Sequence, residues 1–381
     1  MRFSMLRLVL AVAILFALFA VQAPAQEPNG KFITFDVDGA STLPYLGTQP
    51  YANNNFGMAV GYYTDTNIVP HGFFRTPKGE IVSFDAPGAD LTTGADHGTV
   101  AYAVNNWGAI AGQLQDSTGL YHGFIRYPNG SFVTFNPPCD GCGNNQGAGG
   151  TANINIEGEA AGFYLDAESN IHSFVRSPGG KITTFDAPNG TGTTIVCFET
   201  CLNASGETTG WYSDTKGTHG FVRYANGNIE TFDGPNSIAA PNMSTIGASI
   251  NDQGDITGYY LGADRVYHSY IRKRDGTITT FDVTSVEHDE FEGTFAVSIN
   301  ALGAVTGIFS DETNVNQGFE RWPDGSITTF DVPQNNIGSN QGTRPSTNNI
   351  SGQVAGWYTD GNNLNHGFIW CPNEDSCECS R

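Results

Sequence analysis

The side chains of this 381-residue sequence best suited to acid/base chemistry are its eight histidines, because an imidazole titrates near neutral pH. Six of them occupy one position of a repeated motif, which reads HGFFRTPKGEIVSFD, HGFIRYPNGSFVTFN and HGFVRYANGNIETFD in three copies. A catalytic base is needed once in a site, so a histidine repeated at even spacing predicts a structural hydrogen bond. One copy carries Gln317 instead, which fits that role. The six are His71, His122, His172, His219, His268 and His366.

The two remaining histidines lie where the repetition breaks. His97 follows Asp96 in ADHGT, and His288 lies in the acidic segment SVEHDEFEG. If these loops converge, their imidazoles and carboxylates form an acid/base site, and the alternative function is a hydrolase or lyase. No nucleophile signature, oxyanion motif or glycine-rich phosphate loop accompanies them. The enzyme is therefore the second interpretation.

The acidic segment also supplies the weak metal candidates Asp289, Glu290 and Glu292. Their carboxylate oxygens suit Ca²⁺, although a solvated loop explains them equally well. No segment matches an Asp-x-Asp-x-Asp-Gly calcium loop. We expect no cofactor, with Ca²⁺ as the alternative.

Seven cysteines in an exported chain predict disulfides. Cys139 and Cys142 share one loop, Cys197 and Cys201 share another, and Cys371, Cys377 and Cys379 lie near the C-terminus. The first four could instead hold zinc. Because seven is odd, at least one thiol is free or pairs between molecules.

The N-terminal segment predicts export. Arg2 and Arg7 precede an apolar run that ends at Ala23-Pro24-Ala25, as in a cleavable signal peptide. We expect residues 1–25 to be removed and the mature protein to be secreted or periplasmic, without a membrane anchor. A net charge of −21 opposes binding to nucleic acid or anionic membranes.

Seven repeats fill the mature chain. The motif phenylalanine recurs every 47 to 51 residues, at Phe35, Phe84, Phe135, Phe185, Phe232, Phe281 and Phe330. Each unit also contains Asn-x-x-Gly, which predicts a type I turn. The seven asparagines are Asn54, Asn105, Asn155, Asn203, Asn251, Asn300 and Asn349.

The histidine motif itself predicts a β-hairpin. Asn129-Gly130 read as a two-residue loop places Phe124 opposite Phe135. In that register the arginine four residues after each histidine lies far from the aspartate of the Thr-Phe-Asp segment. We therefore expect the arginine head in solvent and the aspartate in an Asx turn.

A unit is thus a four-stranded antiparallel meander with apolar residues on both faces, which must be covered by neighbouring units. The N-terminal PNGKFITFD supplies only a fourth strand, and the C-terminal unit lacks one. This split predicts an all-β, seven-bladed β-propeller closed by the N-terminal strand, because an open solenoid would expose both edges. The expected propeller domain spans residues 26–371, followed by a Cys-containing tail at residues 372–381.

The pattern INDQGDITGYY…HSYIRKRDGTITTFD resembles the bacterial extracellular HAF repeats, named for a His-Ala-Phe triplet. The resemblance covers all seven units, although this chain writes His-Gly-Phe or His-Ser-Phe. It implies an exported repeat protein without an assigned activity, and it carries over no catalytic residue.

We therefore predict a binding or scaffold module. Its ligand is expected to bind the irregular inter-blade loops or the channel mouth, where the repetition breaks. Its partner is a glycan or a protein, and the chain is expected to be a monomer. A third interpretation is a surface protein assembled through the odd cysteine.

Overall fold

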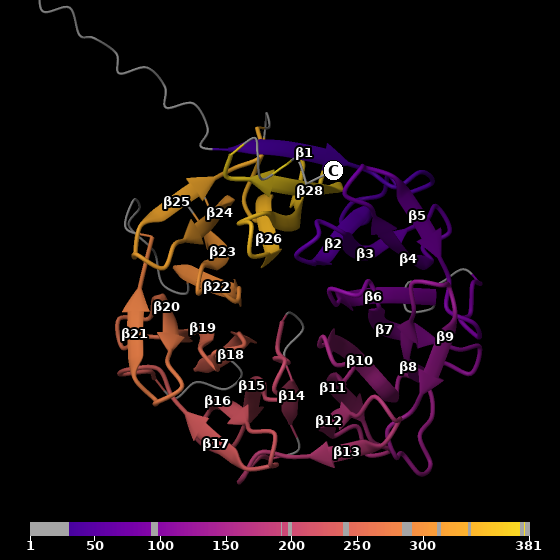
Figure 1. The fold of residues 1–381 in the computed structure, drawn as a ribbon, viewed down its shortest axis with the longest axis horizontal. Coiled ribbons are helices and arrows are strands. Elements are labelled where there is room, and N and C mark those ends of the chain that lie inside the picture. The colour runs from indigo at the N-terminus through magenta and orange to yellow at the C-terminus, as the bar shows by residue number, and fades with distance from the viewer. Residues whose placement is uncertain are drawn as a thin grey trace, which may run out of the picture.

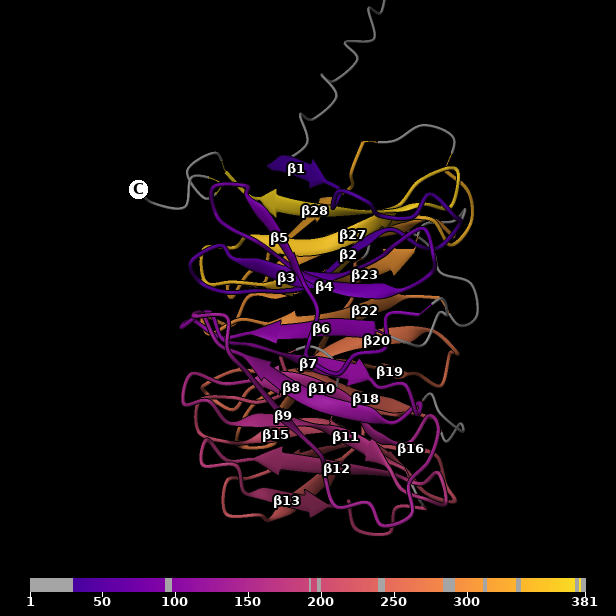
Figure 2. The same cartoon turned by 90° about the vertical axis from the view of Figure 1, so that its right-hand side faces the viewer.

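The computed structural model describes residues 30–92, 98–191, 193–196, 200–238, 244–283, 292–310, 314–333, 337–373 and 377. These residues form 28 β-strands, which are arranged around a central axis (Figure 1). Figure 2 shows the same ring from its edge, with the strands of successive repeats following one another around it. No helix among the described residues is long and apolar enough to cross a membrane.

Four strands come from each repeat unit, in meander order. The first strands, nearest the axis in Figure 1, are β2 (Thr48–Asn53), β6 (Gly98–Val104), β10 (Gly147–Ile154), β14 (Thr194–Val196), β18 (Thr245–Ile250), β22 (Thr294–Ile299) and β26 (Gly342–Asn348). The second strands are β3 (Ala59–Thr64), β7 (Ile110–Gln115), β11 (Ala160–Leu165), β15 (Thr208–Ser213), β19 (Ile256–Leu261), β23 (Val305–Ser310) and β27 (Val354–Thr359).

The third and fourth strands form the outer half of each unit. The third strands are β4 (Pro70–Arg75), β8 (Tyr121–Arg126), β12 (Ile171–Arg176), β16 (Thr218–Arg223), β20 (Tyr267–Arg272), β24 (Asn316–Arg321) and β28 (Asn365–Cys371). The fourth strands are β5 (Ile81–Phe84), β9 (Phe132–Phe135), β13 (Ile182–Phe185), β17 (Ile229–Phe232), β21 (Ile278–Phe281), β25 (Ile327–Phe330) and β1 (Lys31–Phe35).

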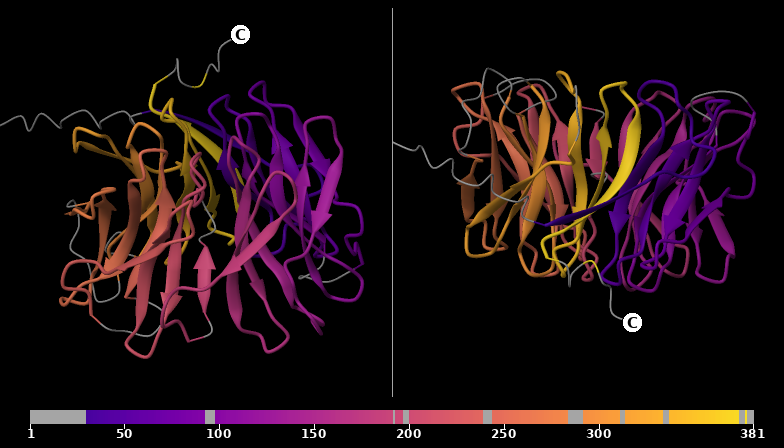
Figure 3. Two further views of the ribbon diagram at one scale, coloured as in Figure 1. Left: turned by 60° about the horizontal axis from the view of Figure 1, so that its bottom comes forward. Right: turned by 90° about the horizontal axis from the view of Figure 1, so that it is seen from above.

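The strands pair into two eight-stranded and three four-stranded sheets, all open. Each eight-stranded sheet joins two meanders through a single parallel bridge, Tyr121 with Gly147 in one and Asn316 with Gly342 in the other. The N-terminal strand β1 pairs antiparallel with β28, from Lys31 opposite Cys371 to Phe35 opposite Gly367. Strands from opposite ends of the sequence therefore belong to one sheet, and Figure 3 shows them side by side.

The register of the histidine hairpin differs from the prediction by one residue. Gly130 N–H donates to the Tyr127 oxygen, and Tyr127 N–H donates to the Ser131 oxygen. Gly130 has a φ of 83°, so the loop is a type I turn followed by a glycine in the left-handed region. As a result Phe135 lies opposite Gly123, and Phe124 lies opposite Thr134. The predicted cross-strand Phe124–Phe135 pair is wrong.

This register explains the glycine of His-Gly-Phe. A Cβ added to Gly123 would lie 2.6 Å from the Phe135 ring, so the missing side chain makes room for the phenylalanine of the neighbouring strand. Gly72, Gly220, Gly318 and Gly367 stand in the same relation to their own motif phenylalanines. Two units carry serine instead, and the Ser173 Oγ bonds main-chain groups of Thr194 and Val196 in the following unit.

The motif phenylalanines also pack against the next unit. Phe135 meets Phe174 of the next unit edge to face, with ring centroids 6.0 Å apart. The arginine of that next unit, Arg176, lies over the same Phe135 ring at 4.9 Å and is only 6% exposed. Equivalent arginine contacts join most neighbouring units.

The prediction that the arginine heads reach solvent is therefore wrong, because the register turns them onto the preceding unit's aromatic ring. In the last unit Trp370 replaces the arginine and stacks on Phe330 at 4.2 Å. A flat side chain is thus kept at this position in every unit, and a cation over an aromatic face contributes about 1 to 2 kcal/mol when shielded from water.

Candidate functional site

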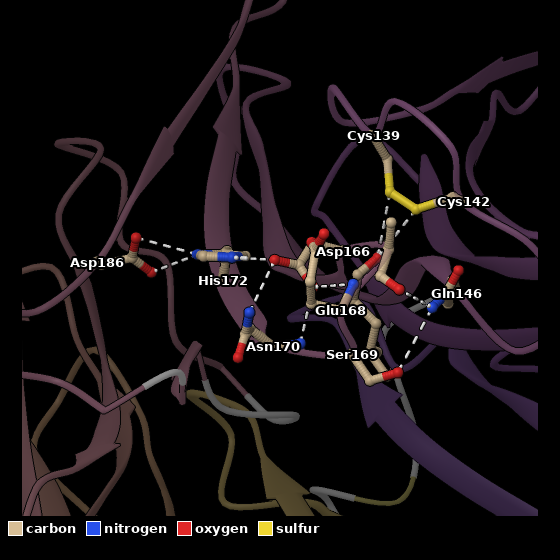
Figure 4. A network of polar contacts seen from close by, with 11 residues as sticks. Cys139, Cys142, Gln146, Asp166, Glu168, Ser169, Asn170, His172 and Asp186 are labelled. Atoms are coloured by element: carbon tan, nitrogen blue, oxygen red, sulfur yellow. Dashed lines mark hydrogen bonds and ion pairs between the residues drawn. A yellow bond between two sulfur atoms is a disulfide. The ribbon is translucent and has the colours of Figure 1, made fainter.

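His172, near the start of β12, lies between two carboxylates (Figure 4). Its Nδ1 is 2.8 Å from Asp186 Oδ1, and its Nε2 is 3.1 Å from Asp166 Oδ2. Asp166 begins the turn between β11 and β12, where its Oδ1 accepts the N–H groups of Glu168 and Asn170. Asp186 directly follows β13. One imidazole therefore ties the turn before its own strand to the end of the next strand.

The same arrangement recurs around the ring. The sequence predicted Asx turns for the aspartates after the motif phenylalanine, whereas their carboxylates bind the histidine. The partners are Asp65 and Asp85 for His71, Asp116 and Asn136 for His122, Asp214 and Asp233 for His219, Asp264 and Asp282 for His268, and Asp360 and Asp36 for His366.

The acceptors on both sides favour the charged imidazolium. A neutral imidazole has one N–H, whereas both nitrogens of His268 face carboxylates, which in their ionised form can only accept hydrogen bonds. The hydrogen bond to Asp282 is the main reason that the pKa of His268 rises to about 9, and Asp264 adds to the effect. Burial opposes this shift. A tyrosine ring, Tyr260, also lies 5.4 Å from the His268 ring.

Five of these histidines thus have a carboxylate facing each ring nitrogen, whereas His122 has Asp116 on one side and Asn136 on the other. An acid/base catalyst must exchange protons with a substrate near its working pH, and an imidazole whose two nitrogens already face neighbouring side chains in six units is poorly placed to do so. The arrangement holds the third and fourth strands of these units together.

The disulfide Cys139–Cys142 lies beside the His172 network. Both sulfur atoms are 3.4 Å from the Leu165 oxygen at the end of β11. From the same loop, Gln146 Nε2 donates to the Ala167 oxygen at 2.9 Å. The irregular loop between β9 and β10 is therefore fastened to the turn that presents Asp166.

The asparagine turns at the inner ends of the units form a second network. As the sequence predicts, the glycine N–H of each turn bonds the asparagine oxygen, for example Gly57 to Asn54 at 3.0 Å. Asn54 Oδ1 also accepts the N–H groups of Phe56 and Met58. Its amide Nδ2 is left to donate outward, and it bonds the main-chain oxygen of Asn105 in the next unit at 3.1 Å.

This outward bond repeats through all seven asparagines and returns to the first. The Nδ2 to oxygen distances are 2.8 to 3.2 Å, in the order Asn54, Asn105, Asn155, Asn203, Asn251, Asn300, Asn349 and back to Asn54. The last bond joins residues 295 positions apart in the sequence. The sequence shows the turns, but it does not show that their side chains connect the units.

The turns surround a hollow of ≈ 180 Å³ at the mouth of the axis. The residue after each asparagine lines it. Asn55 N–H donates to Asn106 Oδ1 of the next unit, and Ala204 N–H donates to Asp252 Oδ1. At four steps of the ring the next unit instead carries Ile156, Ala204, Ala301 or Ile350, whose side chains cannot accept. The side-chain acceptor that Asn106 and Asp252 supply is therefore missing at those four steps.

Large apolar side chains are exposed on the same turns that surround this hollow. Trp107 is 72% exposed, Phe56 is 64% exposed and Leu302 is 65% exposed, each two residues after a ring asparagine. Ile350, which lines the hollow, is 43% exposed. Turn tips are normally polar, so exposed apolar side chains on the turns beside a polar hollow are a candidate ligand site. We refer to Phe56, Trp107, Leu302 and Ile350 as the rim.

The weak catalytic candidates His97, Asp96 and His288 lie outside the described residues, as do Asp289 and Glu290. Glu292 is described, and its main-chain oxygen accepts the Tyr267 N–H. Among the described residues no group of three or more His, Cys, Asp or Glu side chains is placed to hold a metal ion. The enzyme and calcium interpretations therefore stay predictions.

Among the cysteine candidates, Cys371 pairs with Cys377, which joins the end of β28 to the C-terminal tail. Cys201 is also disulfide-bonded. Cys197 and Cys379 lie outside the described residues.

One buried acid was not singled out from the sequence. Glu320 on β24 is 0% exposed, at a position where other units carry apolar residues such as Ile125 and Ile271. Burial raises its pKa to about 8, although Asn348 Nδ2 donates to its Oε1 at 2.8 Å. The sequence signal for this buried acid was a glutamate at a repeat position that is otherwise apolar. Glu320 and Asn348 meet where β24 lies beside β26.

The meander units and their arrangement around an axis define a propeller-like all-β fold. No family model matches the chain, and no curated protein matches it. A solved structure of streptogramin B lyase matches with a TM-score of 0.50 and 14% identity, over 89% of this chain and 97% of that chain. The lectin BP39L from Burkholderia pseudomallei matches with a TM-score of 0.51 and 10% identity, over 86% and 98%.

Puromycin hydrolase also matches, with a TM-score of 0.52 and 12% identity, over 84% of this chain but only 53% of that chain. At these identities the likeness concerns the fold alone. Since proteins of this fold include a lectin and a lyase, the fold itself does not choose between binding and catalysis.

Proposed function

We propose that this protein is an exported, seven-bladed propeller that acts as a binding module, with its ligand at the hollow inside the asparagine ring. Closure of the propeller is supported by the pairing of β1 with β28 and by the Asn349 bond to Asn54. Export is supported by the N-terminal sequence, with Arg2 and Arg7 before an apolar run.

The exposed rim around a polar hollow is the observation that carries the binding role. Flat aromatic faces such as Trp107 pack against the C–H face of a sugar ring, while amide and main-chain groups bond its hydroxyls. The hollow of ≈ 180 Å³ supplies the amide and main-chain groups, and Trp107 and Phe56 are exposed on the same turns, one residue beyond the hollow's lining residues. Together these surfaces suit one sugar residue of a longer glycan. A net charge of −21 disfavours nucleic acid at this surface. The proposed ligand is therefore an uncharged glycan segment.

Replacing Trp107 with alanine tests this proposal. The mature protein is screened on a glycan array, and the affinity of any glycan bound is then measured by calorimetry. We expect Trp107→Ala to weaken binding at least about tenfold, which corresponds to about 1.4 kcal/mol. The melting temperature should change little, because a side chain that is 72% exposed contributes little to packing.

Tyr45→Ala is the matched control. Tyr45 is 65% exposed but precedes β2, whereas Phe56 follows it, so the two lie toward opposite ends of the strand. Binding should be unaffected by this change. If no glycan binds, or if Tyr45→Ala and Trp107→Ala have equal effects, the rim is not the binding site.

A further inference from the structure

A second hollow, of ≈ 390 Å³, lies between two neighbouring units on the side of the asparagine turns. One wall comes from β20 and β21, with Lys273 just after β20 and Thr279 on β21. The other wall comes from Leu302 in the turn after β22, and from Arg321 and Pro323 at the end of β24. The volume is in the range of small-molecule pockets.

The corresponding space one unit earlier is filled by an acid. Thr279 and Arg321 lie 49 residues after Glu230 and Arg272, at the same two positions of the repeat. Arg272 Nη2 donates to Glu230 Oε1, and the Tyr224 hydroxyl donates to Glu230 Oε2 at 2.8 Å. In the earlier unit, the Glu230 carboxylate therefore occupies the space that corresponds to the hollow beside Arg321.

The two arginines are held in the same way. The Arg272 guanidinium lies 5.0 Å from the Phe232 ring centroid, and that of Arg321 lies 5.0 Å from the Phe281 ring centroid. Each also donates Nη1 to the oxygen of the following residue at 3.4 Å. A guanidinium fixed in this way loses little further conformational freedom when it binds an anion. Its N–H groups are therefore preorganised for a carboxylate.

Two substitutions make the second space hollow. Threonine at 279 removes the acid that Glu230 supplies in the earlier unit. Pro323 takes the position of Arg274, whose guanidinium bonds Glu207 in that unit. No carboxylate of the described residues is within ion-pair distance of Arg321, while Lys273 pairs with Asp255 at 2.7 Å. The hollow thus presents Arg321 beside apolar side chains and the Lys273–Asp255 pair. Asp324 offsets part of the Arg321 charge from beyond ion-pair distance, so the guanidinium keeps room for a direct carboxylate partner.

We infer that this hollow binds the carboxylate of a small organic acid, with Arg321 in the role that Arg272 plays toward Glu230. Leu302, Pro323 and Ile271 line the space that the rest of the acid occupies. The net charge of −21 repels polyanions, so a monocarboxylate with a neutral body of sugar size is the class that fits. Leu302 belongs to both this hollow and the rim, but Arg321 and Pro323 are not part of the rim, so carboxylate binding here does not depend on glycan binding there.

The test uses glucuronate as the probe, with glucose as its neutral counterpart and acetate as the bare carboxylate. Binding to the full mature chain is measured by calorimetry or by ligand-observed NMR. We expect glucuronate to bind, acetate to bind more weakly and glucose not to bind at this site. Arg321→Gln should weaken glucuronate binding at least about tenfold.

Arg126→Gln is the matched control, since Arg126 stacks on Phe84 in the same manner but belongs to another junction. It should lower stability similarly and leave glucuronate binding unchanged. Thr279→Glu is the second variant, which copies Glu230 into the hollow. It should raise the melting temperature and abolish binding without removing the arginine.

The inference is overturned if the wild-type protein binds no glucuronate up to about 10 mM. It is also overturned if binding survives both Arg321→Gln and Thr279→Glu, or if glucose binds as well as glucuronate and is lost in the same variants. Because Trp107→Ala leaves this hollow intact, loss of glycan binding in that variant with glucuronate binding retained supports two separate sites.

Discussion

At the scale of single residues, the repeated histidines show how a reactive side chain becomes structural. His268 bonds Asp282 with one nitrogen and Asp264 with the other, so its charge is stabilised on both sides. A group whose pKa is raised by folding adds stability below its unfolded pKa, near 6.5, and that stability is lost as pH rises through the folded pKa. For His268 this window runs from 6.5 to about 9.

Replacement of His268 by glutamine should therefore remove part of the pH dependence of stability. Glutamine keeps a hydrogen-bonding side chain, as Gln317 does at the equivalent position, but it carries no charge. We expect a loss on the order of 2 kcal/mol at pH 6, allowing for partial exposure, and a smaller loss above pH 9. Thermal unfolding at several pH values measures both.

Asp282→Asn provides the control, because it removes the main cause of the raised pKa and keeps the imidazole. It should reduce the same slope. If His268→Gln lowers stability equally at pH 6 and at pH 10, the histidine contributes packing and not charge.

At the scale of strands and turns, the hairpins depend on where a glycine stands. Gly179 and Gly180 are adjacent in the loop between β12 and β13, but only Gly180 has a positive φ, of 91°. A Cβ at Gly179 would meet nothing within 4 Å. The two glycines thus occupy one loop and differ in the backbone conformation that they adopt.

Alanine substitution should have opposite effects at these two positions. Gly180→Ala forces an L side chain into the left-handed region and should destabilise the protein by about 1 kcal/mol. Gly179→Ala reduces the entropy of the unfolded chain and should be neutral or stabilising by about 0.5 kcal/mol. Chemical denaturation of the two variants compares them directly, and equal effects would contradict the loop geometry.

The hairpins also show how far the sequence determines the structure. The strands, the Asn-x-x-Gly turns and the hairpin positions could be predicted, because turn residues and alternating apolar residues act locally. The register was predicted one residue out, because Asn129-Gly130 suits both a two-residue loop and the turn with a left-handed Gly130. The contact of Arg176 with Phe135 depends on how units pack, which no local pattern encodes.

The candidate site was less predictable than the fold. That the turns of Asn54 and Asn105 lie at the axis follows from the repeat, but the bond between them requires the spacing of neighbouring units. Trp107 was not singled out from the sequence, because no local pattern shows that its side chain is exposed. The hollow beside Arg321 could be recognised only by comparing it with the filled space beside Arg272.

At the scale of the whole molecule, the first and last strands belong to one sheet. Phe32 of β1 packs against Phe368 of β28, with ring centroids 5.9 Å apart, and also lies 6.2 Å from Phe330 of the preceding unit. Without β1 the backbone edge of β28 is exposed, and unpaired strand edges promote aggregation.

A chain that begins at Val37 should therefore be destabilised by about 3 kcal/mol or more, because it exposes the surfaces that Phe32, Ile33 and Phe35 cover. A chain that begins at Asn29 keeps β1 and is the control. Thermal unfolding and light scattering compare the two, and a peptide with residues 29–37 should partly restore the shorter chain. Equal stability of both chains would contradict a structural role for β1.

The asparagine ring has a consequence for how this molecule can diversify. Each asparagine amide donates a hydrogen bond to a main-chain oxygen, which every amino acid provides. A unit can therefore bond to any neighbour as long as its own asparagine remains. The side chain two residues after each asparagine takes no part in that hydrogen bond. This position already differs among the units, which carry Phe56, Trp107, Glu157, Ser205, Gln253, Leu302 and Ser351. Mutation can therefore reshape the rim one unit at a time while the architecture beneath it stays intact.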